Sequence, residues 1–253
     1  MSIETYGTGE RLQIAANLAV PISDGHLVFL PVPTTKDNTF ITKTKILLKD
    51  TLQNVEKGSV VVGYELPFEY KESVTSLGAD AIDLAQDEEY LCENARLTAY
   101  AALGYILTKW NKCPKETQFG IVGYGRIGSE LVRLLLFLGA KIKVYTSRQD
   151  LRISLGECDV ETARADWDKG EPLDFSNVEI LINTAPSKMS SSFPQGFVPD
   201  GMRVIELASG ENFDGVVGIE RLPALPERFF PESAARAYVS AIERWLKKRG
   251  KNK

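Results

Sequence analysis

Three glycines spaced as Gly-x-Gly-x-x-Gly, at Gly123, Gly125 and Gly128, constrain the fold more than any other feature of this sequence. They follow the apolar run FGIV (119–122) and open an apolar segment typical of a helix. Glycine permits a tight turn, lets a ligand approach the backbone and lets a helix pack closely on a strand. The succession therefore predicts a strand–turn–helix unit in which the turn and the positive helix end bind phosphate groups.

The rest of the chain alternates between strand-like and helix-like segments. Apolar and β-branched runs predict strands at 27–31, 59–64, 79–85, 118–123, 141–146, 178–186 and 202–209, with 216–220 as a further candidate. Helical spacing predicts helices at 43–55, 68–78, 87–110 and close to the C-terminus, whereas 1–25 indicates an irregular lead or a partial helix. Repeated strand–helix–strand order predicts an α/β fold with parallel sheets covered by helices.

The predicted architecture is a Rossmann doubly wound parallel sheet, which forms the cofactor domain, and a smaller α/β substrate domain. Residues 1–95 and the C-terminal helix (230–250) are assigned to the substrate domain, because an amphipathic last helix needs an apolar partner. Residues 96–229 are assigned to the dinucleotide-binding domain with its leading connector helix. Only 26 residues precede the strand at 27–31, so the substrate domain is expected to be truncated.

Composition excludes several classes of function. A net charge of −4, with five cations gathered in the last seven residues, gives no reason to expect nucleic acid as a partner. Three cysteines without a CxxC pair and a single histidine, His26, argue against a disulfide framework and a metal site. No signal peptide or membrane-length apolar run is present, so we expect a cytoplasmic protein that contacts no membrane.

The end of the strand at 141–146 indicates which dinucleotide binds. An NAD site normally has an acidic residue there, but this stretch reads Thr146, Ser147 and Arg148, whose side chains suit a 2′-phosphate. NADP is therefore predicted, with NAD possible if Arg148 is only a solvated residue at a strand end. The predicted cofactor residues are Gly123, Tyr124, Gly125, Arg126, Ile127, Gly128, Thr146, Ser147, Arg148, Asn183, Thr184, Ala185, Pro186, Leu207, Ala208 and Ser209.

A small-molecule substrate is expected to contact the first domain. The loop after the strand at 27–31 offers Pro33, Thr34 and Thr35, and Asn94 is a further candidate from the connector helix. The polar residues expected to act in the cleft are Glu206, Glu93 and Asn94, although each could equally be a helix cap or a solvated side chain. No catalytic acid or base is assigned.

Several segments together resemble the A-type subunit of dipicolinate synthase, a family related in fold to the D-2-hydroxyacid dehydrogenases. They are FLPVP (29–33), the glycine motif, LGAK (138–141) with Arg148, NTAP (183–186), ELAS (206–209), and ALP (224–226) through Ala234-Ala235. The resemblance implies NADP-dependent oxidation of dihydrodipicolinate during spore formation, and it makes a second subunit of the synthase a candidate partner. A homo-oligomer, such as a dimer, is also expected.

Two alternatives to that activity arise from the same fold. The D-2-hydroxyacid dehydrogenases carry an arginine where this chain has Ala208-Ser209-Gly210, and a histidine near the C-terminus where this chain has none. Oxidation of a hydroxy acid needs such groups, so we do not expect it here. The other alternative, a nucleotide-binding subunit with little catalysis of its own, stays open.

Overall fold

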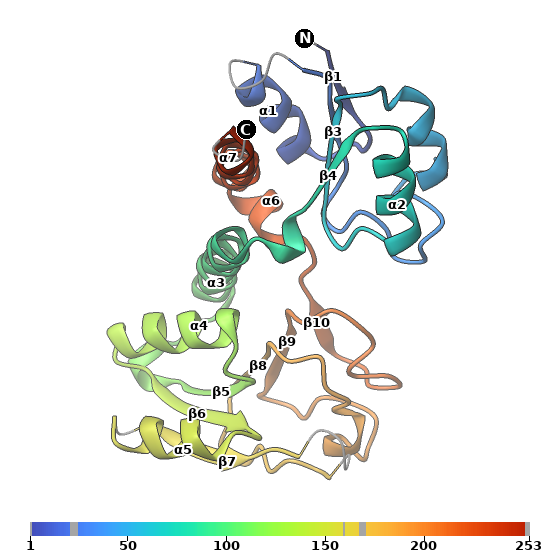
Figure 1. Ribbon diagram of the computed structural model, residues 1–253. Helices are drawn as coiled ribbons and strands as arrows, with labels where there is room; N and C mark the ends of the chain where they lie inside the picture. Colours follow the sequence, from blue (N-terminus) through green and yellow to red (C-terminus); the bar gives the residue numbers. More distant parts are fainter. Residues whose placement is uncertain (1, 21–24, 159, 167–170, 251–253) are drawn as a thin grey trace. The chain divides into compact units, whose positions relative to one another are not determined.

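The computed structural model describes residues 2–20, 25–158, 160–166 and 171–250. The chain forms two compact units, which we describe separately (Figure 1). Unit 1 comprises residues 1–97 and 226–253, and unit 2 comprises 98–225. Helix α3 (Glu88–Lys109) begins in unit 1 and ends in unit 2, and α6 (Leu225–Phe229) lies where the chain returns to unit 1.

Unit 1 is built on a four-stranded parallel sheet with the order β1-β2-β3-β4. Its strands are β1 (Ile3–Thr5), β2 (Leu27–Phe29), β3 (Val60–Gly63) and β4 (Asp80–Asp83). Its helices are α1 (Glu10–Ala19), the 3₁₀ segments η1 (Leu48–Asn54) and η2 (Leu84–Gln86), α2 (Phe68–Ser76) and α7 (Pro231–Gly250).

The expectation of a truncated first domain is wrong. The stretch before β2 contains both β1 and α1, and β1 pairs in parallel with β2, so a complete strand–helix–strand unit opens the chain. The strand could not be predicted because it has three residues, of which none is fully buried, and therefore has no apolar run. The predicted helix at 43–55 is also shorter than expected, since only η1 is helical and Phe40 bridges Leu47 before it.

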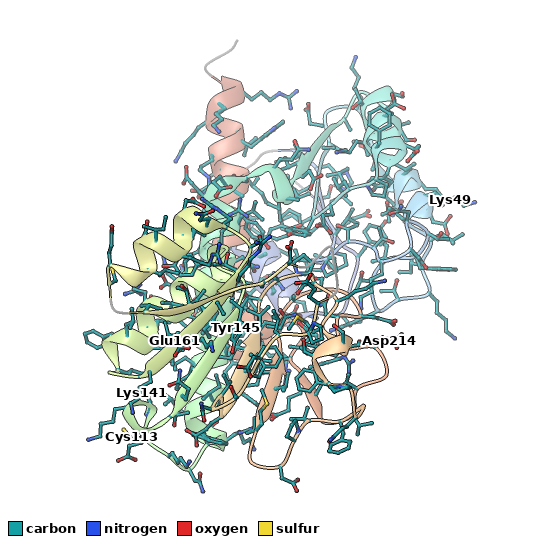
Figure 2. The ribbon with its side chains drawn as sticks, turned by 90° about the horizontal axis from the view of Figure 1, so that it is seen from below. Lys49, Cys113, Lys141, Tyr145, Glu161 and Asp214 are labelled. Atoms are coloured by element: carbon teal, nitrogen blue, oxygen red, sulfur yellow. The ribbon has the colours of Figure 1, made fainter. Side chains whose placement is uncertain are left out.

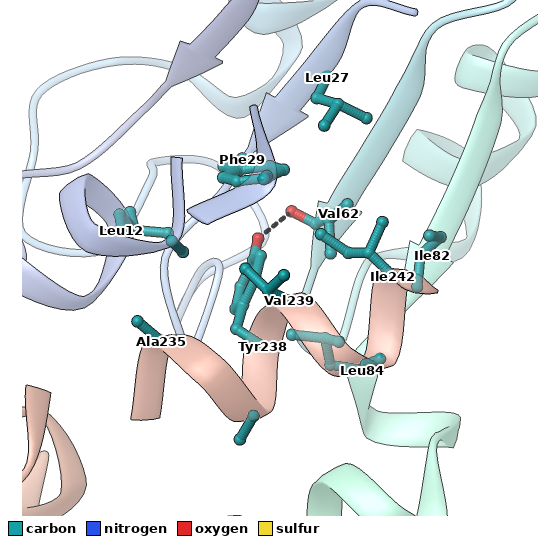
Figure 3. Close-up of a cluster of buried hydrophobic side chains, with 14 of the residues drawn as sticks. Leu12, Leu27, Phe29, Val62, Ile82, Leu84, Ala235, Tyr238, Val239 and Ile242 are labelled. Carbon is teal, nitrogen blue, oxygen red and sulfur yellow. Dashed lines mark hydrogen bonds between the residues drawn. The ribbon is translucent and has the colours of Figure 1, made fainter. Parts of the chain in front are cut away.

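Alternating side chains give the sheet of unit 1 two buried faces. Leu27 and Phe29 belong to a core formed with α1 and α7, whereas Val28 and Leu30 belong to a second core formed with α2 and η1. The buried Tyr238 hydroxyl of α7 donates to the carbonyl oxygen of Val62 at 2.9 Å, which anchors the last helix on strand β3 (Figure 3). The amphipathic last helix is thus a structural part of unit 1.

Unit 2 contains a six-stranded, wholly parallel sheet with the order β10-β9-β8-β5-β6-β7. Its strands are β5 (Gln118–Val122), β6 (Lys141–Thr146), β7 (Glu161–Arg164), β8 (Ile180–Asn183), β9 (Arg203–Glu206) and β10 (Ile219–Arg221). Helices α4 (Arg126–Phe137) and α5 (Gln149–Gly156) join the first three strands, and η3 (Pro114–Glu116) and η5 (Ser190–Ser192) are short 3₁₀ turns. Numbered within the unit, the strand order is 3-2-1-4-5-6, which defines the doubly wound Rossmann fold.

The α/β prediction and most of its elements are confirmed. The connector helix, the four strands predicted between 118 and 209 and the last helix agree with the structure within a few residues, and the candidate strand at 216–220 is β10, shifted to 219–221. Helix α5 and strand β7 were not predicted. Strand β7 lies at the sheet edge and has no buried residue, so it lacks the apolar run by which strands are recognised. Figure 2 shows Tyr145 among the strands of unit 2, with Lys141 and Cys113 towards its periphery.

In the part of the chain that the structure describes, none of the helices has the length and apolar character needed to cross a bilayer.

Candidate dinucleotide-binding site

The candidate site lies at the carboxyl edge of the sheet in unit 2. After β5 the chain continues to β6 on one side, whereas β8, which pairs with β5 on the other side, continues to β9 and β10. This reversal of strand order is a topological switch point, where open α/β sheets bind ligands. The loops after β5 and β8, at 123–125 and 184–187, therefore flank the expected crevice.

The three glycines of the loop after β5 meet different structural demands. Gly123 has φ +88°, and a Cβ there would lie 2.8 Å from the Ala185 Cβ. A Cβ on Gly128 would lie 2.3 Å from the Gly123 carbonyl oxygen, so α4 can approach the turn only because this residue lacks a side chain. Gly125 is exposed, its φ is −84°, and an added Cβ would meet no atom within 4 Å.

The open surface at Gly125 leaves the backbone of the loop accessible. Neither packing nor backbone conformation requires glycine at this position, but a side chain here would cover backbone that a pyrophosphate must approach. The adjoining N-terminal turn of α4 presents amide N–H groups that the helix itself cannot satisfy. The fold thus explains why Gly123 and Gly128 are glycines, whereas packing does not account for Gly125.

The loop after β8 is fastened to the glycine loop. The Thr184 hydroxyl donates to the carbonyl oxygen of Val122 at 2.9 Å, and the Ala185 amide donates to Asn183 Oδ1 at 3.2 Å. Thr184 Oγ1 would lie 2.9 Å from a Cβ on Gly128, so the same side chain also closes off this side of α4. Both turns that line the switch point are therefore held together.

A buried carboxylate lies at the end of β9. Glu206 is 4% exposed and faces Asn183, its register partner on β8. Asn183 Nδ2 donates to Glu206 Oε1 at 3.0 Å, Asn212 Nδ2 donates to Oε2 at 3.2 Å, and the Ala208 amide donates to Oε1 at 2.9 Å. Asn183 Oδ1 accepts from the Ala185 amide, and Asn212 Nδ2 also donates to the carbonyl oxygen of Ser209, which fixes the orientation of both asparagines.

This network holds the loop after β9 in place. Burial raises the pKa of Glu206 above its ordinary value, although the Asn183, Asn212 and Ala208 donors oppose that rise. All these donors favour the ionised form, because a protonated carboxyl would need an acceptor for its own O–H. Glu206 therefore positions the segment 207–209 at the site instead of presenting a free proton carrier to it.

The end of β6 carries the residues predicted to select the cofactor. Thr146 is buried and accepts a hydrogen bond from the Arg148 amide at 3.3 Å, while Ser147 is exposed. The Arg148 guanidinium pairs with Asp150 at 2.5 Å, and this contact lowers the pKa of the Asp150 carboxyl. Asp150 was not identified from the sequence, although its place two residues beyond Arg148 was a usable signal.

The other predicted cofactor residues fall around the same edge. Tyr124 is half-buried, and burial raises the pKa of its hydroxyl. The remaining members lie in the loops after β5, β8 and β9 or in the first turn of α4, namely Arg126, Ile127, Pro186, Leu207, Ala208 and Ser209. Their contacts with a cofactor stay a prediction.

The predicted substrate residues lie in unit 1. Thr34 is fully buried, donating to the carbonyl oxygen of Pro31 at 3.1 Å and accepting from the Tyr64 amide at 2.8 Å. The Thr35 hydroxyl donates to Asp37 at 3.2 Å. These bonds shape the loop after β2, so both threonines have structural roles, and their contact with a substrate stays a prediction.

The remaining candidates from the sequence are Pro33, Asn94 and Glu93. Pro33 is partly buried in the loop after β2, and Asn94 is partly buried on α3. Glu93 pairs with Arg96 at 2.7 Å along the same helix. Among the described residues, no three histidine, cysteine or acidic side chains are grouped as metal ligands would be.

These features define a two-unit α/β protein with a Rossmann fold and an open glycine loop at its switch point. No family model matches the chain, and no curated protein matches it. Among solved structures it is similar to the A-type subunit of dipicolinate synthase from Bacillus halodurans, with 19% identity, 97% of each chain covered and a TM-score of 0.73. The corresponding protein from Bacillus subtilis gives 16% identity, 100% coverage of this chain and 98% of that chain, and a TM-score of 0.76.

An L-alanine dehydrogenase is also similar, with 13% identity, 97% of this chain and 89% of that chain covered, and a TM-score of 0.58. At these identities the comparisons show a shared fold. The predicted Rossmann relation to dipicolinate synthase and to dehydrogenases is confirmed at that level.

Proposed function

We propose that the chain is a nicotinamide-dependent oxidoreductase that binds its dinucleotide at the carboxyl edge of unit 2. The observation that carries this proposal is the glycine loop, where Gly125 leaves the backbone open while Gly123 and Gly128 are packed tightly. The similarity in fold to dipicolinate synthase and to an alanine dehydrogenase supports it.

In this proposal each loop has a separate task. The amides of residues 124–128 hold the pyrophosphate, and the end of β6 holds the adenosine ribose. The segment 207–209, which Glu206 fixes, borders the nicotinamide end. When bound, a nicotinamide would supply or accept a hydride, and the residues of these loops would bind and orient it.

We further propose that the cofactor is NADP. Arg148 provides a cation at the ribose, and its exposed pairing with Asp150 is weak enough to yield to a phosphate dianion. NAD is the competing choice, because Asp150 offers the carboxylate that would accept hydrogen bonds from a free ribose diol.

Dihydrodipicolinate is the proposed substrate, on the basis of the resemblance in sequence segments and of the similarity in fold. A second candidate function is a nucleotide-binding subunit that depends on a partner for catalysis. It is favoured by one observation: Glu206, the acidic residue that precedes the segment 207–209, is enclosed by its three donors. An enzyme active alone would need a proton carrier from elsewhere in the chain.

Calorimetric titration of the purified chain with NADPH and NADH tests the binding proposal. Gly125→Val places a branched side chain over the loop and should abolish binding while leaving the fold intact, because the added Cβ meets no protein atom within 4 Å. Gly104→Val is the matched control, since its Cβ on α3 also has open space, and it should bind as the unchanged chain does. Undiminished NADPH affinity in Gly125→Val would overturn the assignment.

Turnover separates the two candidate functions. NADPH formation from NADP and dihydrodipicolinate by the chain alone would support the enzyme. Turnover that requires a second, added component of the synthase would support the partner-dependent alternative.

A further inference from the structure

Three arginines gather at the carboxyl end of β6 and the start of α5. Arg148 is the N-cap of α5, Arg152 lies one turn further along the same helix, and Arg164 ends the neighbouring strand β7. Only Arg148 was identified from the sequence. Since Arg152 and Arg164 are 4 and 16 residues further along the chain, sequence alone does not show that they are neighbours.

The sheet register brings Arg164 to this position. Arg164 is directly opposite Thr146 in the parallel pairing of β6 with β7, and Thr146 is two residues before Arg148. Strands are spaced about 4.8 Å apart, and two extended residues span about 7 Å. The Cα atoms of Arg148 and Arg164 therefore lie within about 12 Å, a gap that two arginine side chains reaching towards each other can bridge.

Arg152 adds a buried donor, its Nε, to this group. Its Nε is buried, and no hydrogen-bond partner for it occurs among the described residues. Its helical position places it beside Arg148, because its amide donates to the Arg148 carbonyl oxygen at 3.3 Å. Buried donors without an acceptor are uncommon in folded proteins, and a phosphate oxygen is an acceptor of the kind this one lacks.

The other two arginines pair with carboxylates two residues away, of which Asp150 is exposed and Asp166 is partly buried. Arg148 pairs with Asp150 at 2.5 Å and Arg164 pairs with Asp166 at 2.8 Å, and both arginine side chains are more than 60% exposed. The Arg148–Asp150 pair, exposed on both sides, contributes little stability, so a dianion can displace that carboxylate. With both aspartates counted, the five side chains still carry one net positive charge.

We propose that Arg164 and Arg152, together with Arg148, form a binding site for the 2′-phosphate of an adenosine nucleotide. This inference rests on the proposed function, which places the ribose at the end of β6. Arg164 is the specificity-determining residue contributed by the edge strand, and Arg152 supplies its unsatisfied Nε–H from α5. The three guanidinium groups match the several oxygens of a phosphate monoester.

The test uses nucleotides that lack nicotinamide, so it does not depend on turnover. Adenosine 2′,5′-bisphosphate and adenosine 5′-monophosphate are titrated into the full chain by calorimetry, and the bisphosphate should bind at least about tenfold more tightly. Arg164→Ala should weaken the bisphosphate by about tenfold and leave the monophosphate within about twofold. The exposed position of Arg164 makes this variant expected to fold, and circular dichroism verifies it.

Two further variants sharpen the result. Arg236→Ala removes an equally exposed arginine, paired with Glu232 on α7 of unit 1, and should change neither affinity. Asp150→Asn releases Arg148 from its carboxylate and should strengthen bisphosphate binding, an effect that a purely structural ion pair would not produce.

Equal affinities for the two nucleotides, unchanged in Arg164→Ala, would overturn the arginine site. If NADPH and NADH still bind and Gly125→Val still abolishes that binding, the proposed function survives such a result. Failure to bind any of the four nucleotides would overturn both proposals.

Discussion

Replacing Asn183 with alanine should destabilise the protein in a pH-dependent way. Asn183 is fully buried, and its Nδ2 contacts both Glu206 oxygens, at 3.0 and 3.3 Å, so the substitution leaves the buried carboxylate with two donors. Loss of one hydrogen bond to a charged group costs about 1.5–3 kcal/mol, and the lost bond from the Ala185 amide to Asn183 Oδ1 adds about 1 kcal/mol. We expect a total loss of about 3 kcal/mol near pH 8, or about 6–12 °C in Tm.

The sign of the pH dependence follows from the raised pKa of Glu206. A carboxyl group whose pKa is higher in the folded state than in the unfolded state lowers stability as pH rises from the ordinary value of 4.5 through the raised value. Removing the Asn183 donor, which lowers the pKa of Glu206, raises the folded-state pKa further. The deficit of Asn183→Ala should therefore be largest at pH 8 and shrink as the pH is lowered towards 5.

Thermal unfolding followed by calorimetry at pH 8, 6 and 5 measures this deficit. Val204→Ala is the matched control, since Val204 is fully buried next to Leu181 in the same sheet and has no titrating side chain. Its deficit should be independent of pH, and placing Asn183→Ala in a Glu206→Gln background should remove the pH dependence of the pair. A deficit for Asn183→Ala that is the same at all three pH values would refute the role of the buried charge.

Three further outcomes are expected. Gly128→Ala should lower both stability and dinucleotide affinity, because its Cβ would lie 2.3 Å from the Gly123 carbonyl oxygen; denaturant unfolding and NADPH titration measure the two losses. Tyr238→Phe should cost about 1 kcal/mol in a urea melt, because the buried hydroxyl donates to the carbonyl oxygens of Leu30 and Val62; no loss would mean that these bonds add nothing net. Glu227→Ala should lower the free energy of unfolding by about 3 kcal/mol, because it leaves the buried Arg11 without its carboxylate. This is the lower end of the range for buried pairs, since Glu227 is partly exposed. Glu232→Ala, which removes an exposed pair, should lower it by less than about 1 kcal/mol.

Patterns local in the chain were enough to predict much of unit 2. The run 119–122, the three glycines after it and the apolar helix that follows form one continuous segment, so the strand, turn and helix can be recognised from neighbouring residues. The strand at 141–146 and the connector helix were equally clear, because each is long and its apolar residues repeat with one period. The short edge strands β1 and β7 could not be predicted, because they bury too little apolar surface to show an apolar run in the sequence.

The sequence by itself determined the α/β class and the glycine loop after β5, because these depend on residues close together in the chain. Only the tertiary structure decided that Asn183, Glu206 and Asn212 share one buried network, and that Arg164 lies opposite Thr146. Both facts depend on parallel pairing between strands separated in sequence by a helix or a long loop. The register of such pairs is set by the packing of the whole sheet, and no local pattern of residues specifies it.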